Sequence, residues 1–402
     1  MNALRRQFFL SYAVIGSVMP LMTVFLREQG GFDFPQIGLA MSLMNIPMLC
    51  SPALITLLAD RNLDSRRILA IAYTCSSIVL SLMYFSDNIA LTLTLFFFHG
   101  LSFVAMLPLQ DGYYFSLAES MTKRDEAPLS YPLVRVWGTV GFILPSLILF
   151  LPLSRGASAS SILPCAVFFC LLSLANSFFL PKVDRPILSK SSLPTKDALR
   201  AIFGPDARWL SIGLFFGFMA ASTYYAFIGN YLDEVVGIPK RHIGLIINIG
   251  VVLEIGFTLL MPWMQRKIHL KGIMVAGLFS MLARMFLMAY FPTTAVAILV
   301  QVFHGLEVLA LFVGPVMFLN RLATDEFRNS IQGVFTMAVG GVARVIGGVA
   351  AGFVVGQFGL QGGLLYGGIL ATIAFFIITF LFSRIPPPSE IDKIAVSTSG
   401  AS

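Results

Sequence analysis

The chain has 402 residues, of which 57% are hydrophobic and only 12% carry a charge, whereas a soluble domain has about 25% charged residues. With so few polar residues the chain could not cover a water-exposed surface, which excludes a soluble enzyme, a disordered chain and a nucleic-acid-binding protein. The composition indicates an all-α membrane protein, and the formal net charge of +7 follows the membrane topology described below.

A membrane-spanning helix needs about 20 predominantly apolar residues. In chain order, such runs between charged residues cover 8–26, 34–59, 68–86, 88–110, 136–154 and 156–181. A polar stretch rich in proline, residues 182–208, predicts a cytoplasmic linker. Further runs cover 209–232, 242–263, 272–291, 294–319, 331–355 and 363–382. The sequence therefore predicts twelve transmembrane helices in two six-helix bundles, residues 1–181 and 209–383, followed by a cytoplasmic tail at 384–402.

Lysine and arginine gather in the cytoplasmic loops of membrane proteins. An even number of spans places both termini on one side of the membrane, and most of the 27 lysines and arginines fall on that side. We therefore expect both termini in the cytoplasm, in a plasma membrane or a bacterial inner membrane.

The two halves of the chain share short sequences. Phe98–Leu101 recurs as Phe303–Leu306, and Arg135–Gly138 resembles Arg344–Gly347. Parallel repeats of six helices, related by a pseudo-twofold axis along the membrane normal, are typical of transporters whose site lies between the halves.

Ionisable side chains in the middle of a span are costly, about 2.5–3.5 kcal/mol each, and usually face a cavity or a partner. Asp111 and Arg135 come at similar depth, so we expect them to pair. His304 and Glu307 stand three residues apart and share a helix face. The sequence leaves the roles of Arg344 and His99 open. The ionisable residues within the predicted spans, or one residue beyond them in the case of Asp111 and Arg135, are Asp111, Arg135, Glu254, Arg284, Glu307 and Arg344, with His99 and His304.

The loop after the second span resembles the signature of the major facilitator superfamily, G-x-L-[AG]-D-R-x-G-R-[RK]. Here the leading Gly is missing, and Asp64 stands where a Gly is usual. The resemblance implies the major facilitator fold. It also implies a gating loop that latches the two halves in the outward-facing state, formed by Asp60, Arg61, Arg66 and Arg67.

Segments 107–111, 135–142 and 303–308 resemble spans four, five and ten of lactose permease and of the nucleoside and phenylpropionate proton symporters. The resemblance implies a proton-coupling group of Glu307, His304, Arg284 and Glu254. The expected substrate-binding residues are Asp111, Arg135, Phe142, Trp137, Tyr225, Asn230 and Asn248.

Several positions depart from the lactose permease pattern. Phe142 replaces a tryptophan that stacks on galactose, Tyr225 replaces an aspartate, and Gln301 and Gly340 lie where lysines are usual. The proton machinery is therefore retained better than the sugar pocket, which argues against a galactoside.

Together these features predict a symporter that imports a small organic solute, such as a sugar, a nucleoside or an aromatic acid, together with protons. It would use no cofactor or metal and work as a monomer in the bilayer. An alternative is a proton-antiporting exporter. An acidic residue in the first span would support it, and that span has none. A different class, a membrane enzyme or a transport-dead sensor, stays open; an enzyme would need clustered polar residues near one interface, and the four histidines are scattered.

Overall fold

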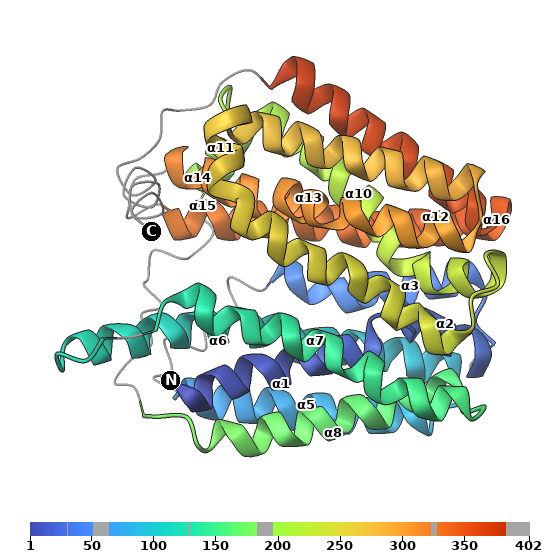
Figure 1. The fold of residues 1–402 in the computed structure, drawn as a ribbon, viewed down its shortest axis with the longest axis horizontal. Coiled ribbons are helices and arrows are strands. Elements are labelled where there is room, and N and C mark those ends of the chain that lie inside the picture. Colours follow the sequence, from blue (N-terminus) through green and yellow to red (C-terminus); the bar gives the residue numbers. More distant parts are fainter. Residues whose placement is uncertain (30, 51–63, 128, 183–195, 323–327, 383–402) are drawn as a thin grey trace. The chain divides into compact units, whose positions relative to one another are not determined.

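The structure is a computed structural model that describes residues 1–29, 31–50, 64–127, 129–182, 196–322 and 328–382. The described residues form helices joined by short loops and contain no strand (Figure 1). By their contacts they divide into two compact units. Unit 1 comprises Met1–Lys190 with Ala226–Asn248, and unit 2 comprises Ser191–Tyr225 with Ile249–Ser402.

Unit 1 begins with a spanning segment that is interrupted around Pro20, because proline has no N–H to donate to the helix ladder. The next helix begins with a capping box, in which the Asp33 side chain accepts from the Gln36 backbone and the Gln36 side chain bonds in return. The helices are α1 (Asn2–Val18), α2 (Met22–Gln29), α3 (Phe34–Asn45), α5 (Ser65–Tyr84), α6 (Ile89–Thr122), α7 (Tyr131–Ser154) and α8 (Ile162–Ser177).

The helices from residue 196 onward are α9 (Lys196–Ile202), α10 (Arg208–Asn230), α11 (Lys240–Tyr290), α12 (Thr294–Leu299), α13 (His304–Val308), α14 (Gly314–Leu322), α15 (Arg328–Phe335) and α16 (Val342–Phe376). Two of these, α11 and α16, contain one non-helical residue each, His269 with φ 58° and Gly359 with φ 72°. The chain bends there, so each long helix covers two of the predicted spans. The end of α10 and the start of α11 belong to unit 1 by their contacts.

Four π-helical turns interrupt the later helices. They are η4 (Tyr231–Val235), η6 (Leu309–Val313), η7 (Thr336–Gly341) and η8 (Ile377–Leu381). A π turn contains one extra residue per turn and often marks a functional site. Each turn therefore shifts which side chains face the interior after it.

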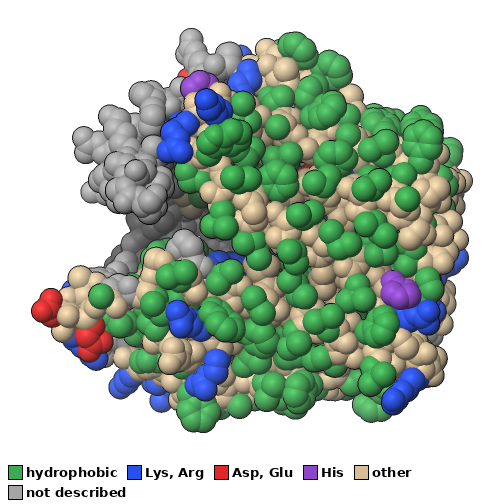
Figure 2. Space-filling view, in the orientation of Figure 1, with side chains coloured by type: hydrophobic (Ala, Val, Ile, Leu, Met, Phe, Trp, Pro, Cys, Tyr) green, Lys and Arg blue, Asp and Glu red, His purple; other side chains and the backbone are tan. Residues whose placement is uncertain are grey.

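Within the described residues, 8 helices are long and apolar enough to cross a membrane, and two shorter apolar helices cover Phe34–Leu49 and Ile89–Phe103. This confirms an all-α membrane protein. The count of twelve spans and the bundle boundaries stay predictions, and residues 51–59 of the second predicted span lie outside the described residues. On the face that Figure 2 shows, hydrophobic side chains cover much of the helices and charged ones are few, as a lipid-facing surface requires.

Helices α1 and α7 approach each other at backbone contact through two glycines. A side chain on Gly16 would collide with the Phe142 carbonyl, and one on Gly141 would collide with the Phe9 carbonyl. Such small residues allow close helix packing where no hydrophobic effect drives association. The pair brings the middle of α7 against α1, and Arg135, near the start of α7, lies over the Tyr12 ring of α1.

The shared sequences of the two halves have the same packing role. Gly100 in α6 lies against the Met44 carbonyl of α3, and Gly305 in α13 lies against Phe257 and Glu254 of α11. In both units the glycine brings a spanning helix against the helix two spans earlier. This agreement supports the internal repeat that the sequence predicts.

Candidate functional site

A buried ion pair lies at the centre of unit 2. The Nη1 atom of Arg284, in the second part of α11, donates to Glu307 Oε2 of α13 over 2.8 Å. The two side chains are only 2% and 6% exposed. A buried pair of this kind costs desolvation energy that only close contact offsets, so each charge depends on the other.

Two neutral side chains hold the other end of Arg284. Its Nη2 atom donates to the Tyr224 hydroxyl and, over 3.2 Å, to Gln301 Oε1. The Arg284 Cζ atom also lies 3.8 Å from the centre of the Tyr224 ring. The guanidinium therefore has partners that do not depend on whether Glu307 is charged.

An irregular stretch of helix presents these groups. A 3-10 turn, η5 (Val300–Phe303), precedes α13, and the π turn η6 follows it. Gln301, His304 and Glu307 succeed one another at intervals of three residues, so they lie along one side of this stretch.

His304 connects the buried pair to a second carboxylate. Its Nε2 atom lies 3.5 Å from Glu254 Oε2 of α11, and the Tyr225 ring stands edge-on to the imidazole at 6.5 Å. The approach needs Gly250, because a Cβ there would lie 2.8 Å from His304 Cβ. The structure thus brings the four predicted proton-coupling residues together in unit 2.

Two polar atoms of the buried pair have no hydrogen-bond partner among the described residues: Glu307 Oε1 and Arg284 Nε. A carboxyl group can hold a proton on its free oxygen while its other oxygen still faces the arginine. The arrangement can therefore gain and release a proton at Glu307.

Asp111 and Arg135 are both described and form no direct ion pair, so the expected pairing is wrong. Instead, Asp111 Oδ1 accepts a hydrogen bond from the Tyr131 hydroxyl over 2.8 Å. The guanidinium of Arg135 lies over the Tyr12 ring of α1, 4.1 Å from its centre. Tyr131 and Tyr12 supply partners that depth along the helix does not reveal, although Asp111 and Arg135 still interact electrostatically.

The structure does not bring two predicted substrate residues of α7, Trp137 and Phe142, into the contacts of Asp111 and Arg135. Trp137 is 42% exposed and lies on the outer side of α7 with Leu133 and Val140. Phe142 is 8% exposed and lies at the contact between α7 and Gly16.

Two predicted asparagines belong to unit 1, whereas the Arg284 group belongs to unit 2. Asn230 donates to the Thr23 carbonyl over 3.4 Å and to Glu234 over 3.3 Å. Asn248 donates to the Ile143 carbonyl over 3.3 Å. Each is buried and has an oxygen without a partner among the described residues. Their donated bonds join the segment Ala226–Asn248 to Thr23 of α2 and to Ile143 of α7.

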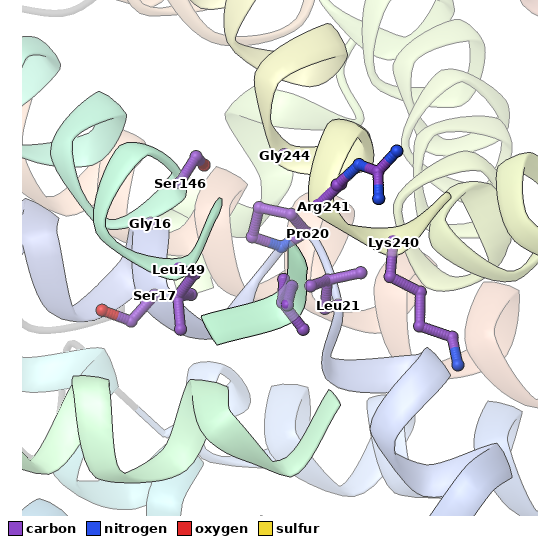
Figure 3. A pocket seen from close by; sticks show the side chains of 10 residues that line it. Gly16, Ser17, Pro20, Leu21, Ser146, Leu149, Lys240, Arg241 and Gly244 are labelled. Carbon is purple, nitrogen blue, oxygen red and sulfur yellow. The ribbon is translucent and has the colours of Figure 1, made fainter. Parts of the chain in front are cut away.

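A small cavity of about 10 Å³ lies where this segment meets α1 and α7, and Gly16, Pro20, Ser146 and Gly244 line part of it (Figure 3). This space holds about one water molecule, so it is not a solute site.

Of the predicted gating loop, Asp60 and Arg61 lie outside the described residues. Arg66 forms an ion pair with Asp64 and donates to the Leu180 carbonyl over 3.1 Å, while Arg67 is exposed. The hydrogen bonds from Arg66 hold the pKa of the Asp64 carboxyl below its usual value. Arg66 therefore joins the start of α5 to the end of α8.

From the sequence, Tyr224 stands out only as one more aromatic residue of a predicted span, and neither Gln301 nor Tyr131 has a predicted role. The signal for Tyr224 and Gln301 was available, because a buried arginine needs more partners than one carboxylate. Nothing comparable marks Tyr131, which stands at the start of α7.

Comparisons with known proteins agree with this picture. The model of a family described as nucleoside H+ symporter matches residues 2–385. Nucleoside permease NupG of Escherichia coli (strain K12) is 23% identical over an alignment of 415 positions, which covers 96% of this chain and 97% of that protein. Xanthosine permease of the same strain is 23% identical over 379 residues, covering 88% and 87%. The crystal structure of nucleoside transporter NupG matches with a TM-score of 0.80 at 20% identity, covering 95% of this chain and 99% of that one. This likeness confirms the expected major facilitator fold.

Proposed function

We propose, on the premise that this chain belongs to the nucleoside H+ symporter family, that it imports a nucleoside together with a proton. The chain is a proton-coupled secondary transporter of a multi-pass membrane family, and not an enzyme. The named relatives, a nucleoside permease and a xanthosine permease, support a nucleoside over the sugar or aromatic acid that the sequence left open. Membership of a symporter family also disfavours a proton-antiporting exporter.

The observation that carries the proton-coupling proposal is the buried pair of Arg284 and Glu307. When a proton binds the free Oε1 of Glu307, the carboxyl becomes neutral and its charge-assisted bond to Arg284 weakens. Tyr224 and Gln301 already hold Nη2 of Arg284, so the cation keeps partners in the protonated state. The protonation state of one residue thereby decides between two arrangements of a buried group.

His304 and Glu254 extend this switch toward the solute in our proposal. Glu254 is the more accessible partner, with 29% of its side chain exposed against 10% for His304. A solute that bonds to Glu254 competes with His304 for the carboxylate. Release of His304, three residues before Glu307, would then change the field at the proton carrier.

Asp111, Tyr131 and Arg135 suit the hydroxyl groups of a ribose. Asp111 offers acceptor atoms, and Arg135 offers a planar fork of donors. Vicinal hydroxyls both donate and accept, so this combination matches them. We keep Tyr225 as a lining residue, because it stands beside His304.

The remaining proposals concern the setting of the transporter. We propose that it works as a monomer in the lipid bilayer, with both termini in the cytoplasm. The loop that contains Asp60, Arg61, Arg66 and Arg67 would act as its gate.

The test is transport in proteoliposomes with Glu307→Gln, a substitution that keeps the shape and imitates the protonated state. We expect nucleoside accumulation driven by a proton gradient to be lost, while exchange of labelled for unlabelled nucleoside persists. The matched control is Glu126→Gln, at an exposed position outside the predicted spans, which should behave as wild type. Accumulation at the wild-type level by Glu307→Gln would refute the assignment of the carrier.

A further inference from the structure

Arg344 lies on aromatic rings inside unit 2. Its Cζ atom stands 4.5 Å from the centre of the Phe218 ring and 5.5 Å from that of Phe312. These two rings contact each other edge to face at 5.8 Å, and Tyr225 lies near enough to interact with the guanidinium electrostatically. An ionisable group within a spanning segment is a functional residue by default.

One residue from each of two π turns lies beside the Arg344 guanidinium. Phe312 belongs to η6 and Gly340 belongs to η7. A Cβ on Gly340 would lie 2.9 Å from Arg344 Nη1, so the bare glycine leaves the space that the guanidinium uses. Irregular helix on both sides of one side chain is typical of a functional position rather than of plain packing.

Arg344 repeats the geometry of Arg135 in unit 1. Both arginines begin the Arg-Val-x-Gly sequence, both lie over a ring of the first spanning helix of their half, and both are partly exposed. A glycine also makes room for each, since a Cβ on Gly138 would lie 2.9 Å from Arg135 Nη1. If Arg135 recognises solute, the same construction in unit 2 is suited to the same task.

The surroundings of the two arginines differ in chemistry. Arg135 shares its region with Asp111 and the hydroxyl of Tyr131, which suits ribose hydroxyls. Arg344 lies on the Phe218 ring and near the Phe312 ring, and aromatic side chains stack on the flat faces of nucleobases. A guanidinium fork also matches the O6 and N7 acceptors along one edge of a 6-oxopurine.

We propose that Arg344 recognises the base of the solute and selects nucleosides with a 6-oxopurine base, such as inosine, over adenosine. In adenosine the 6-position carries an amino donor, which faces the guanidinium donors without forming a bond. This inference rests on the proposed function, because it assumes that the solute is a nucleoside.

The experiment measures the dissociation constants of inosine, 7-deazainosine and adenosine by calorimetry on purified full-length protein in detergent. Wild type should bind inosine about 10-fold more tightly than adenosine, with 7-deazainosine between them. Arg344→Lys keeps the charge but loses the fork, so it should weaken inosine binding about 10-fold and adenosine binding less than about 3-fold.

One further variant and a control separate recognition from packing. Gly340→Ala keeps the arginine but intrudes on the space of Arg344 Nη1, so it should reproduce the selective loss for inosine. Arg208→Lys removes a guanidinium that lies over Trp209 at 5.3 Å and should change neither constant.

Each outcome decides something. Equal losses for inosine and adenosine in Arg344→Lys and Gly340→Ala would make Arg344 a packing residue and overturn the inference, as would unchanged constants. A wild-type preference for adenosine would overturn the choice of base. If wild type binds uridine but none of the three purine nucleosides, the choice of base fails while the proposed function stands. If it binds no nucleoside at all, the proposed function itself fails.

Discussion

His99 in unit 1 and His304 in unit 2 occupy equivalent places in the repeat but have different partners. The Nδ1 atom of His99 lies 3.3 Å from the Ser76 hydroxyl, whereas Nε2 of His304 faces the Glu254 carboxylate at 3.5 Å. The glycine that follows each histidine is closely packed, Gly100 on the Met44 backbone and Gly305 on the Phe257 ring and the Glu254 backbone. The comparison teaches that the repeat preserves close glycine packing beside the histidine, while only His304 of unit 2 faces a carboxylate.

The cores of the two units show the same contrast. In unit 1 the Ser11 hydroxyl bonds to Gln110 and Tyr73, and Gln7 accepts from Asn176; these are neutral groups. In unit 2, the charged pair of Arg284 and Glu307 is one of the contacts that join the helices. Unit 1 is therefore suited to be a stable scaffold, and unit 2 is suited to change with protonation.

The largest expected effect comes from breaking the charged core. Arg284→Met should destabilise the protein by about 3–5 kcal/mol, because it leaves a buried carboxylate without its partner. In unit 1, Gln110→Met should cost only about 1–3 kcal/mol, since it removes neutral hydrogen bonds. Chemical denaturation in detergent, followed by tryptophan fluorescence, measures both.

The double variant Arg284→Met with Glu307→Met checks the reason for that loss. It should regain most of the stability because no unpaired charge remains. A double variant no more stable than Arg284→Met would mean that packing, not charge, explains the loss.

A smaller effect should separate the two histidines. His304→Gln should reduce proton-driven uptake about 5- to 150-fold, the usual size of a coupling between two sites. His99→Gln should leave uptake within about 2-fold of wild type and cost about 1 kcal/mol of stability, the value of one hydrogen bond. Uptake at pH 6 and pH 8 in proteoliposomes measures the difference, and equal losses in the two variants would contradict it.

The smallest expected effect concerns Asp64, whose pKa in the folded protein is lowered by Arg66. A lowered pKa contributes stability that is complete above the unfolded-state value and is lost as the pH falls through the folded-state value. Asp64→Asn should therefore be less stable than wild type by under about 1 kcal/mol at pH 7. Melting temperatures that differ more at acidic than at neutral pH would show that the sign is wrong.

The sequence could predict the fold, because span length, charge pattern and the shared Phe-His-Gly-Leu segment are local properties. Only the resemblance to known symporters grouped Arg284 with Glu307. It could not predict which ring or hydroxyl lies opposite each charge, because this depends on helix rotation. Asp111 bonds to Tyr131 rather than Arg135 for this reason. Asn230 and Asn248 have suitable depth, but they donate to the Thr23 and Ile143 carbonyls.

The π turns add a further reason. Each one rotates the following residues by the angle of one extra residue, and no local pattern in the sequence marks them. Arg344 follows η7 directly, so a regular helix projection places its guanidinium on the wrong side. Its position on Phe218 and Phe312 could be seen only in the structure.

The reciprocal glycine contacts of α1 and α7 limit how the transporter can move. Since each backbone abuts the other at two heights, neither helix can slide or roll without a steric clash. The two must travel as one body through the transport cycle, and Tyr12 and Arg135 keep a fixed spacing in every state. A covalent cross-link between these two helices should consequently be harmless to turnover.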